Sequence, residues 1–172
     1  MKVGVAGYSG PIALPPVSEI ADECVELGRR LAEKGHLIVN GGRDGVMELV
    51  SRGAKEVGGK VVGVLPFVRE GANEYLDFAL FTGLDFQMRS FVMLKNMDVM
   101  VAVGGEVGTA IEILGAYANA IPVILFRGTG GWTDRFANVL IEGRYLDTRK
   151  TVEVYQAWSV SEILDIIETL GH

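Results

Sequence analysis

The stretch VAVGGEVGTAIEIL, from Val101 to Leu114, runs from an apolar, β-branched segment into two glycines, a third glycine, a threonine and then a carboxylate. A strand that passes through glycines into a helix is typical of α/β proteins, where such turns hold ligands. Glycine lets backbone N–H groups approach a ligand closely, and a helix N-terminus offers unpaired amides and a partial positive charge to an anion. The stretch therefore predicts a strand, a turn and a helix with an anion site between them.

Strand and helix patterns alternate along the rest of the chain. The predicted strands are 2–6, 36–40, 60–66, 78–83, 98–105, 121–126 and 151–156. The predicted helices are 18–35, the later part of 41–59, 84–97, 109–120, 132–143 and 159–171, with a loop at 67–75. Runs such as KVVGVL are apolar throughout, as expected of strands covered on both faces. The pattern predicts one Rossmann-like domain over 1–172: an α/β, three-layer, doubly wound, mostly parallel sheet with helices on both faces.

Local signals predict some of the helix ends. Ser18 is expected to cap the first helix, which should stop at Gly35, and Ser159 or Ser161 is expected to cap the last one. Cys24 lies within the amphipathic pattern of the first helix, which indicates packing rather than a nucleophile.

Composition narrows the classes of function. The formal net charge of −6 argues against a broad nucleic-acid surface, which depends on many cationic side chains. A single cysteine excludes an intramolecular disulfide, and His36 and His172 are too few for a zinc cluster, so no metal is predicted. The longest apolar run is too short to span a bilayer and the first residues do not read as a signal peptide, so we expect a cytoplasmic protein without membrane partners.

Three glycine-rich turns are expected at one edge of the sheet, because each follows a strand: AGYSG at 6–10, NGGRDG at 40–45 and GGEVGT at 104–109. Neither GxGxxG with its acidic partner nor GxxxxGK[ST] is present, which favours a mononucleotide or similar phosphate over NAD or ATP. The expected ligand-binding and phosphate-binding residues are Gly7, Ser9, Gly41, Gly42, Gly45, Gly104, Gly105, Gly108 and Thr109.

Two of these turns match a known family. GGRDGVMEL at 41–49 and VGGEVGTAIE at 103–112 resemble the GGxxGLMG and PGGxGTxxE motifs of the Lonely Guy phosphoribohydrolases and of relatives that carry a lysine decarboxylase label. The segments around them follow the same order, and the resemblance covers about 2–146. It implies a Rossmann-like fold that binds a nucleoside 5′-monophosphate and, in the best-known members, hydrolyses its N-glycosidic bond to give free base and ribose 5-phosphate.

The resemblance also implies roles for individual residues. The last turn and the helix start would receive the phosphate, Glu112 would contact the ribose and assist catalysis, and Arg89 would complete the site. Cleavage builds positive charge at the anomeric carbon. A carboxylate such as Glu112 can stabilise this charge or orient the attacking water. Decarboxylation is not expected, because no lysine lies in a recognisable cofactor setting, and no cofactor is predicted.

Each of these side chains also has a structural alternative. Thr109 and Glu112 have the T-x-x-E spacing of a capping box, in which the glutamate would serve the helix alone. Arg89 lies in an apolar helix and can reach solvent along its neighbours. Asp44 can cap the second helix, and Arg43 can be an ordinary surface residue. The sequence leaves both sets of roles open.

Several positions depart from the family motifs. Val103 replaces a proline, Glu106 and Val107 make the last turn one residue longer, and Ser90 stands where a lysine usually follows the arginine. With these changes, the chain resembles a neighbouring branch of the superfamily that includes molybdenum-cofactor carrier proteins. Those proteins bind a phosphorylated pterin without transforming it. Two hypotheses follow: an N-glycosidase acting on nucleoside monophosphates, and a non-catalytic carrier or sensor of a phosphorylated ligand.

Two apolar segments bear on assembly. The helix at 84–97 and LGAYANA at 114–120 supply more nonpolar surface than one sheet face needs, which predicts a homodimer or homotetramer. The alternative is that both are ordinary helices covering the sheet.

Overall fold

The computed structural model describes residues 1–67 and 70–171. Seven strands form one sheet in the order β4-β3-β2-β1-β5-β6-β7, and every neighbouring pair is parallel. The strands are β1 (Lys2–Gly7), β2 (Leu37–Asn40), β3 (Lys60–Leu65), β4 (Phe78–Phe81), β5 (Val99–Val103), β6 (Val123–Phe126) and β7 (Val154–Ala157). The predicted Rossmann-like sheet is confirmed, and among the described strands it is parallel throughout rather than mostly so.

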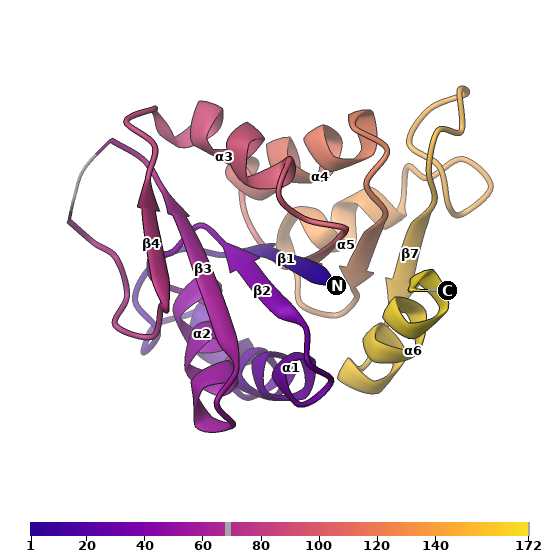
Figure 1. Ribbon diagram of the computed structural model, residues 1–172. Helices are drawn as coiled ribbons and strands as arrows, with labels where there is room; N and C mark the ends of the chain where they lie inside the picture. The colour runs from indigo at the N-terminus through magenta and orange to yellow at the C-terminus, as the bar shows by residue number, and fades with distance from the viewer. Residues whose placement is uncertain (68–69, 172) are drawn as a thin grey trace.

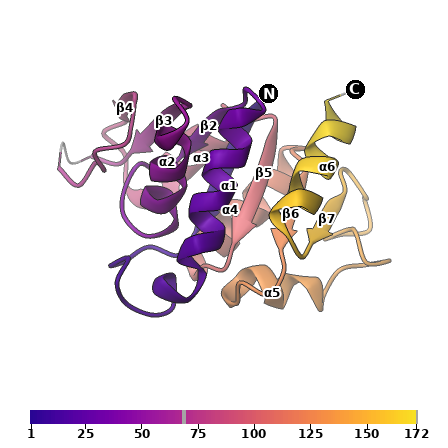
Figure 2. The same ribbon diagram turned by 90° about the horizontal axis from the view of Figure 1, so that it is seen from below.

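Helices cover both faces of the sheet. They are the short 3₁₀ helix η1 (Val17–Ile20), α1 (Ala21–Glu33), α2 (Val46–Glu56), α3 (Phe86–Leu94), α4 (Val107–Ala118), α5 (Gly131–Ala137) and α6 (Val160–Leu170). Figure 1 shows α3 and α4 above the sheet and α1 and α2 below it, and Figure 2 shows α1, α2 and α6 side by side on that lower face. Side chains of α5 pack in the same hydrophobic cluster as those of α3 and α4. The result is a three-layer α/β arrangement.

Strand β5 shows why its sequence is apolar at every position. Val99, Val101 and Val103 pack into the cluster formed with α1, α2 and α6. Met100 and Ala102 point to the opposite face and pack with α3 and α4. Successive side chains of a strand alternate between faces, so a central strand covered on both sides must be apolar throughout.

The helix caps agree with the sequence only in part. Ser159 caps α6, because its hydroxyl accepts the Glu162 amide at 3.2 Å. Ser18 does not cap α1: it lies inside η1, and α1 begins after Ile20 without a side-chain cap. The expectation of a helix N-terminus at Ser18 was therefore wrong by one short 3₁₀ turn. Cys24 is buried in the core as predicted, and burial raises the pKa of its thiol to about 12.

Two other segments differ from the prediction or lie partly outside the description. The helix predicted over 132–143 is shorter in the structure and ends at Ala137, and further on Glu142 and Gly143 adopt positive φ in a tight turn that pairs Ile141 with Tyr145. In the predicted loop at 67–75, residues 68–69 lie outside the described part of the chain, and the other positions form neither helix nor strand. Within the described residues, no helix is both long and apolar enough to cross a bilayer.

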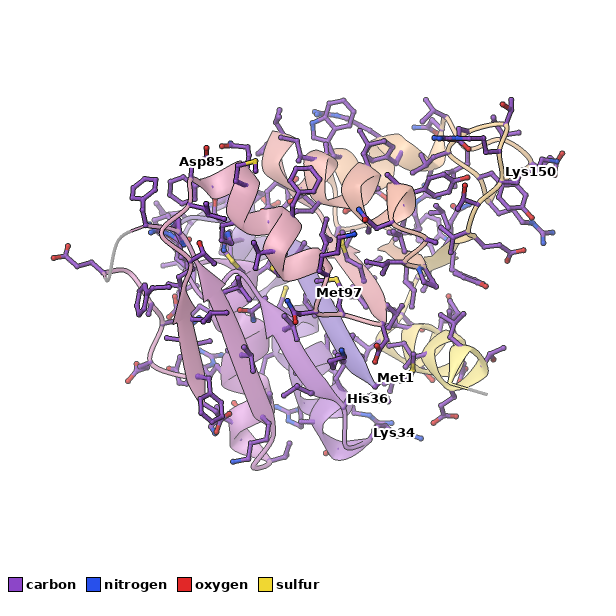
Figure 3. The ribbon with its side chains drawn as sticks, turned by 45° about the horizontal axis from the view of Figure 1, so that its top comes forward. Met1, Lys34, His36, Asp85, Met97 and Lys150 are labelled. Atoms are coloured by element: carbon purple, nitrogen blue, oxygen red, sulfur yellow. The ribbon has the colours of Figure 1, made fainter. Side chains whose placement is uncertain are left out.

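The topology places a crevice at one edge of the sheet. Strand β1 lies between β2 and β5, so the order of the strands reverses at this point. In open α/β sheets, ligands bind outside the carboxyl ends of the strands at such a switch point. Figure 3 shows Asp85, at the start of α3, near this edge, whereas Met1, Lys34 and His36 lie together at the opposite end of the sheet. The three glycine-rich turns follow β1, β2 and β5 and therefore meet at the carboxyl edge.

Candidate functional site

A cavity of about 340 Å³ lies at the switch point. Residues from all three glycine-rich turns line it, together with the first turns of α3 and α4. Of the predicted site residues, it brings together Gly7, Ser9, Gly41, Arg89, Gly108, Thr109 and Glu112. Gly42, Gly45, Gly104 and Gly105 do not line it. The cavity is therefore built by the predicted turns, but by only some of their glycines.

The turn after β2 opens onto the cavity through Gly41. A Cβ at this position would lie 2.5 Å from Nη1 of Arg89 and 2.6 Å from Sδ of Met47, so only glycine leaves room for the arginine. Gly42, with φ of +73°, donates its amide to Oδ1 of Asn40 at 2.8 Å and packs against Leu65. Gly41 thus borders the site, while the next glycine shapes the turn behind it.

The turn after β5 uses its glycine pair in a different way. The Gly104 amide donates to Oγ1 of Thr129 at 2.7 Å, and its carbonyl accepts from Oγ1 of Thr133 at 2.7 Å. The Gly105 carbonyl accepts the Trp132 amide at 2.9 Å. These bonds tie the turn to the loop after β6 and to the first turn of α5. The backbone groups involved are already paired inside the protein and are not available to a ligand.

The N-terminus of α4 faces the cavity instead. The amide of Ala110 is bonded to the Glu106 carbonyl at 3.1 Å, and it follows the amides of the first turn, which have no intrahelical acceptor. Gly108 is exposed, and a Cβ built on it meets nothing within 4 Å. The Thr109 hydroxyl donates to the Gly7 carbonyl at 3.2 Å. The helix therefore presents amides and its positive dipole end to the cavity at Gly108 and Thr109.

Arg89 is buried beside this cavity, with only 5% of its surface exposed. Its Nη1 donates to the carbonyls of Gly41 at 2.7 Å and Val64 at 2.6 Å, while its buried Nε has no partner in the described residues. Burial lowers the pKa of the guanidinium, and the charge of Glu112 acts in the opposite direction. The alternative in which Arg89 simply reaches solvent along apolar neighbours was wrong.

Glu112 does not form the capping box. The N-cap of α4 is Glu106, which makes no side-chain cap, and the Thr109 hydroxyl bonds to Gly7. One carboxylate oxygen of Glu112 accepts the Ser90 hydroxyl at 2.8 Å. Burial raises the pKa of Glu112, and the Ser90 hydrogen bond and the Arg89 charge offset this in part. A glutamate one turn into α4 is thus held at the cavity wall by α3.

Helix α3 begins so that several of its residues reach the site. Asp85 caps it by accepting the Met88 amide at 2.8 Å. Phe86, Arg89 and Ser90 are spaced three and four positions apart, lie on one face of the helix, and all line the cavity. The helical spacing from Arg89 was the signal in the sequence that could have identified Phe86.

Sequence reasoning also missed part of the wall beside α2. Arg43 lines the cavity, with its guanidinium carbon 5.4 Å from the centre of the Phe86 ring, so it is not an ordinary surface residue. Asp44 lines the cavity as well, and it does not cap α2, whose N-cap is Gly45 without a side-chain bond. Glu106 brings the extra carboxylate of the lengthened turn to the same cavity. Within the described residues, no group of three acidic, histidine or cysteine side chains is placed to hold a metal.

The fold and the cavity together define a Rossmann-like α/β protein with a ligand-sized cavity at the switch point of its sheet. The chain belongs to the SLOG cluster4 family, whose model matches residues 1–163. This bears out the resemblance to the Lonely Guy superfamily seen in the two glycine motifs.

Solved structures extend this likeness over the whole chain. The X-ray structure of TM1055, a structural genomics target, is 65% identical with a TM-score of 0.96, and 98% of each chain is covered. The molybdenum cofactor binding protein of Rippkaea orientalis is 28% identical with a TM-score of 0.80, over 99% of this chain and 97% of that chain. The molybdenum cofactor carrier protein of Chlamydomonas reinhardtii is 29% identical with a TM-score of 0.79, over 98% and 96%.

Curated relatives match over shorter stretches. An uncharacterized protein of Archaeoglobus fulgidus is 39% identical over 121 residues, which are 66% of this chain and 71% of that protein. The probable cytokinin riboside 5′-monophosphate phosphoribohydrolase LOGL5 of Oryza sativa subsp. japonica is 38% identical over 94 residues, 52% of this chain and 38% of that protein. Across four such phosphoribohydrolases, the chain spans between 38% and 59% of the relative's length.

Proposed function

We propose that the cavity binds a nucleoside 5′-monophosphate, or a phosphorylated ligand of similar size, and that the protein hydrolyses the N-glycosidic bond of such a nucleotide. The observation that carries the proposal is the placement of Glu112. Its carboxylate is not used by its own helix; Ser90 holds it at the cavity wall at 2.8 Å, beside the buried guanidinium of Arg89. The similarity to phosphoribohydrolases supports the reaction class.

The two ends of the cavity suit different parts of a nucleotide. The amides of Gly108 and Thr109 at the start of α4 favour the phosphate, which needs donors and positive potential. Glu112 lies one helical turn further along α4, where the ribose of a bound nucleotide would follow its 5′-phosphate. The guanidinium of Arg89, fixed by the Gly41 and Val64 carbonyls, places a positive charge at the cavity wall that favours a phosphate or ribose oxygen nearby. The polar groups along the cavity wall thus lie in the same order as the phosphate and the sugar of a nucleotide.

The reaction would use the carboxylate of Glu112 beside the sugar ring. In hydrolysis, the bond between the anomeric carbon and the base nitrogen breaks, a water oxygen bonds to that carbon, and one proton of the water ends on the base. Positive charge develops on the sugar in the transition state, and an ionised Glu112 would stabilise it and orient the water. The Ser90 hydroxyl, which donates to the Glu112 carboxylate at 2.8 Å, would hold it in position for this role.

A second candidate is a non-catalytic carrier of a phosphorylated pterin. It is favoured by the similarity to the two molybdenum cofactor proteins, which extends over at least 98% of this chain, whereas the phosphoribohydrolases match only part of it. A carrier would use the same amides and the same arginine, and would leave Glu112 without a chemical role.

Base release distinguishes the two candidates. The purified protein is incubated with a panel of nucleoside 5′-monophosphates, and free base and ribose 5-phosphate are followed. We expect Glu112→Gln to lower release at least 100-fold, while Glu106→Gln, which removes an exposed carboxylate from the same cavity, retains most of it. Binding without release by the unchanged protein would contradict the hydrolase and leave the carrier.

We also propose that the protein forms a homodimer or homotetramer through α3 and α4. Their outer surfaces expose large apolar side chains, including Met88, Phe91, Val107 and Leu114, of which 40% to 62% is accessible. Large apolar side chains exposed on two helices that pack together are typical of protein interfaces. Light scattering should give a mass of two or four chains, and a monomer at micromolar concentration would contradict the proposal.

A further inference from the structure

We propose that Arg43 and Phe86 form the wall that selects the ring of the ligand. The ring would carry a carbonyl oxygen next to a ring-nitrogen acceptor, as the 6-oxopurines of GMP and IMP do and as a 4-oxopterin does, and it would be preferred over a 6-aminopurine such as AMP. The inference rests on the proposed binding of a phosphorylated heterocycle in the cavity, and it adds the chemical class of the ring.

The backbone that carries Arg43 is held in place. Asn73 donates from Nδ2 to the Arg43 carbonyl at 2.8 Å and from its amide to the Gly42 carbonyl at 2.9 Å. Gly41 and Gly42, which precede Arg43, are buried. The side chain therefore starts from a restrained turn, so little backbone freedom is lost when it binds a ligand.

The guanidinium of Arg43 has unused donors. It lies over the Phe86 ring at 5.4 Å, and Phe86 is in turn held edge-on by Phe67, with ring centres 6.0 Å apart. Across the described part of the chain, this guanidinium makes no hydrogen bond or ion pair to another residue. Arg89 is different, because its Nη1 is bonded to two carbonyls of the protein. Of the two arginines that line the cavity, Arg43 is the one with neither terminal nitrogen bonded within the described residues, whereas Arg89 has its Nη1 committed and its Nε buried.

The position of Arg43 suits the ring end of a nucleotide. Its turn follows β2, and the amides that favour phosphate follow β5, with β1 between the two strands. Two strand spacings amount to about 10 Å, which is comparable to the distance between the phosphate and the far edge of a nucleotide base. Glu112, Arg89 and Ser90 lie in the same cavity and suit the sugar between the two ends.

The donor geometry of arginine determines which ring fits. A guanidinium offers two parallel N–H groups, which match an adjacent carbonyl oxygen and ring nitrogen such as O6 and N7 of guanine. Adenine presents N7 beside an amino group, which is itself a donor and opposes one arm of the fork. The Phe86 ring supplies a flat surface for stacking without distinguishing these bases. Arg43 would therefore determine which ring is preferred, and Phe86 would contribute affinity that all the rings share.

The test measures binding of GMP, IMP, AMP and a pterin carrying one phosphate by calorimetry, with the protein unchanged and as Arg43→Met, Arg43→Lys and Arg52→Met. We expect the unchanged protein to bind at least one oxo ring about 10- to 100-fold more tightly than AMP. Arg43→Met should bring the oxo ligands close to AMP with little change for AMP itself. Arg43→Lys, which keeps the charge without the fork, should lose most of the preference. Arg52→Met removes the same charge from α2 outside the cavity lining and should keep it.

The outcomes separate the inference from the function on which it depends. Equal binding of AMP and the oxo ligands, or an equal loss for all ligands in Arg43→Met, would overturn the selectivity while leaving the binding function intact. Tighter binding of the pterin than of GMP and IMP would support recognition of this ring edge by a pterin carrier. Tighter binding of GMP or IMP would support recognition of the same edge in a nucleotide. Binding of none of the four ligands to the unchanged protein would overturn the proposed function and this inference together.

Discussion

The turn after β2 and the turn after β5 are built from similar sequences but use their glycines differently. In the first turn, Gly41 borders the cavity and makes room for Arg89. In the second, Gly104 and Gly105 are bonded to the start of α5 and the loop before it, and Gly108 contacts the cavity instead. A glycine pair therefore marks a turn of a given shape, and the position of the turn within the fold decides whether a ligand can reach it.

Gly104→Ala tests the structural role of the glycine pair after β5. The new Cβ would lie 2.1 Å from a ring carbon of Tyr8, and φ at this position is +58°. We expect a loss of about 2 to 4 kcal/mol in the free energy of unfolding, measured by urea denaturation. Gly35→Ala, with φ of +76° and nothing within 4 Å of its Cβ, isolates the backbone strain and should lose about 1 kcal/mol. An equal loss of unfolding free energy in the two variants would show that Tyr8 moves aside at little cost and that packing does not require glycine at position 104.

Gly41→Ala tests the role of the turn after β2 in ligand binding. Its Cβ would displace the Arg89 guanidinium, so we expect ligand affinity to fall about 10-fold or more, with a smaller loss of stability than in Gly104→Ala. Gly58→Ala is the control, because its Cβ meets no protein atom and the residue lies outside the cavity lining, so its ligand affinity should match that of the unchanged protein. If Gly41→Ala binds ligand as well as the unchanged protein does, Arg89 does not need its present position.

The smallest expected effect is the dependence of stability on pH in Glu112→Gln. Burial raises the pKa of Glu112 in the folded state, so the folded protein holds this proton more tightly than the unfolded chain. The ionised carboxylate therefore costs stability above its folded pKa, and the cost vanishes as the pH falls towards the unfolded value of about 4.3. Glu112→Gln should be more stable than the unchanged protein at pH 8, with a gain that shrinks as the pH falls.

Ser90→Ala provides the opposite change at the same carboxylate. It removes the hydrogen bond that favours the charged form of Glu112, so its loss of stability should be largest at high pH. Thermal unfolding of both variants from pH 5 to 8 measures the two trends. A gain for Glu112→Gln that is the same at every pH would contradict the assignment of the effect to the ionised carboxylate.

The sequence predicted the architecture because strands and helices differ in periodicity. The continuous apolar run of β5 and the amphipathic pattern of α1 are local signals, and they identified the sheet and its helices. The cap at Ser18 failed because the chain makes a 3₁₀ turn before α1 begins, which residue preferences near a serine do not reveal.

The site was predictable where motifs carried it and not where contacts between helices did. The two glycine motifs and the spacing to Glu112 located the cavity. The partner of Glu112 is Ser90 on α3, 22 positions away, so the T-x-x-E spacing pointed to a capping box that the structure does not contain. Arg43 was missed because its side chain could be placed only after Phe86 on α3 was seen to lie beside it.

The hydrogen bonds of Arg89 bear on the thermodynamics of binding. One nitrogen on α3 joins the carboxyl ends of β2 and β3 through the Gly41 and Val64 carbonyls. The floor of the cavity is therefore assembled before any ligand arrives, and association incurs little entropy cost for ordering it. Free and occupied forms of the protein should then superpose closely in this region, so the affinity should reflect the contacts made rather than a rearrangement of the fold.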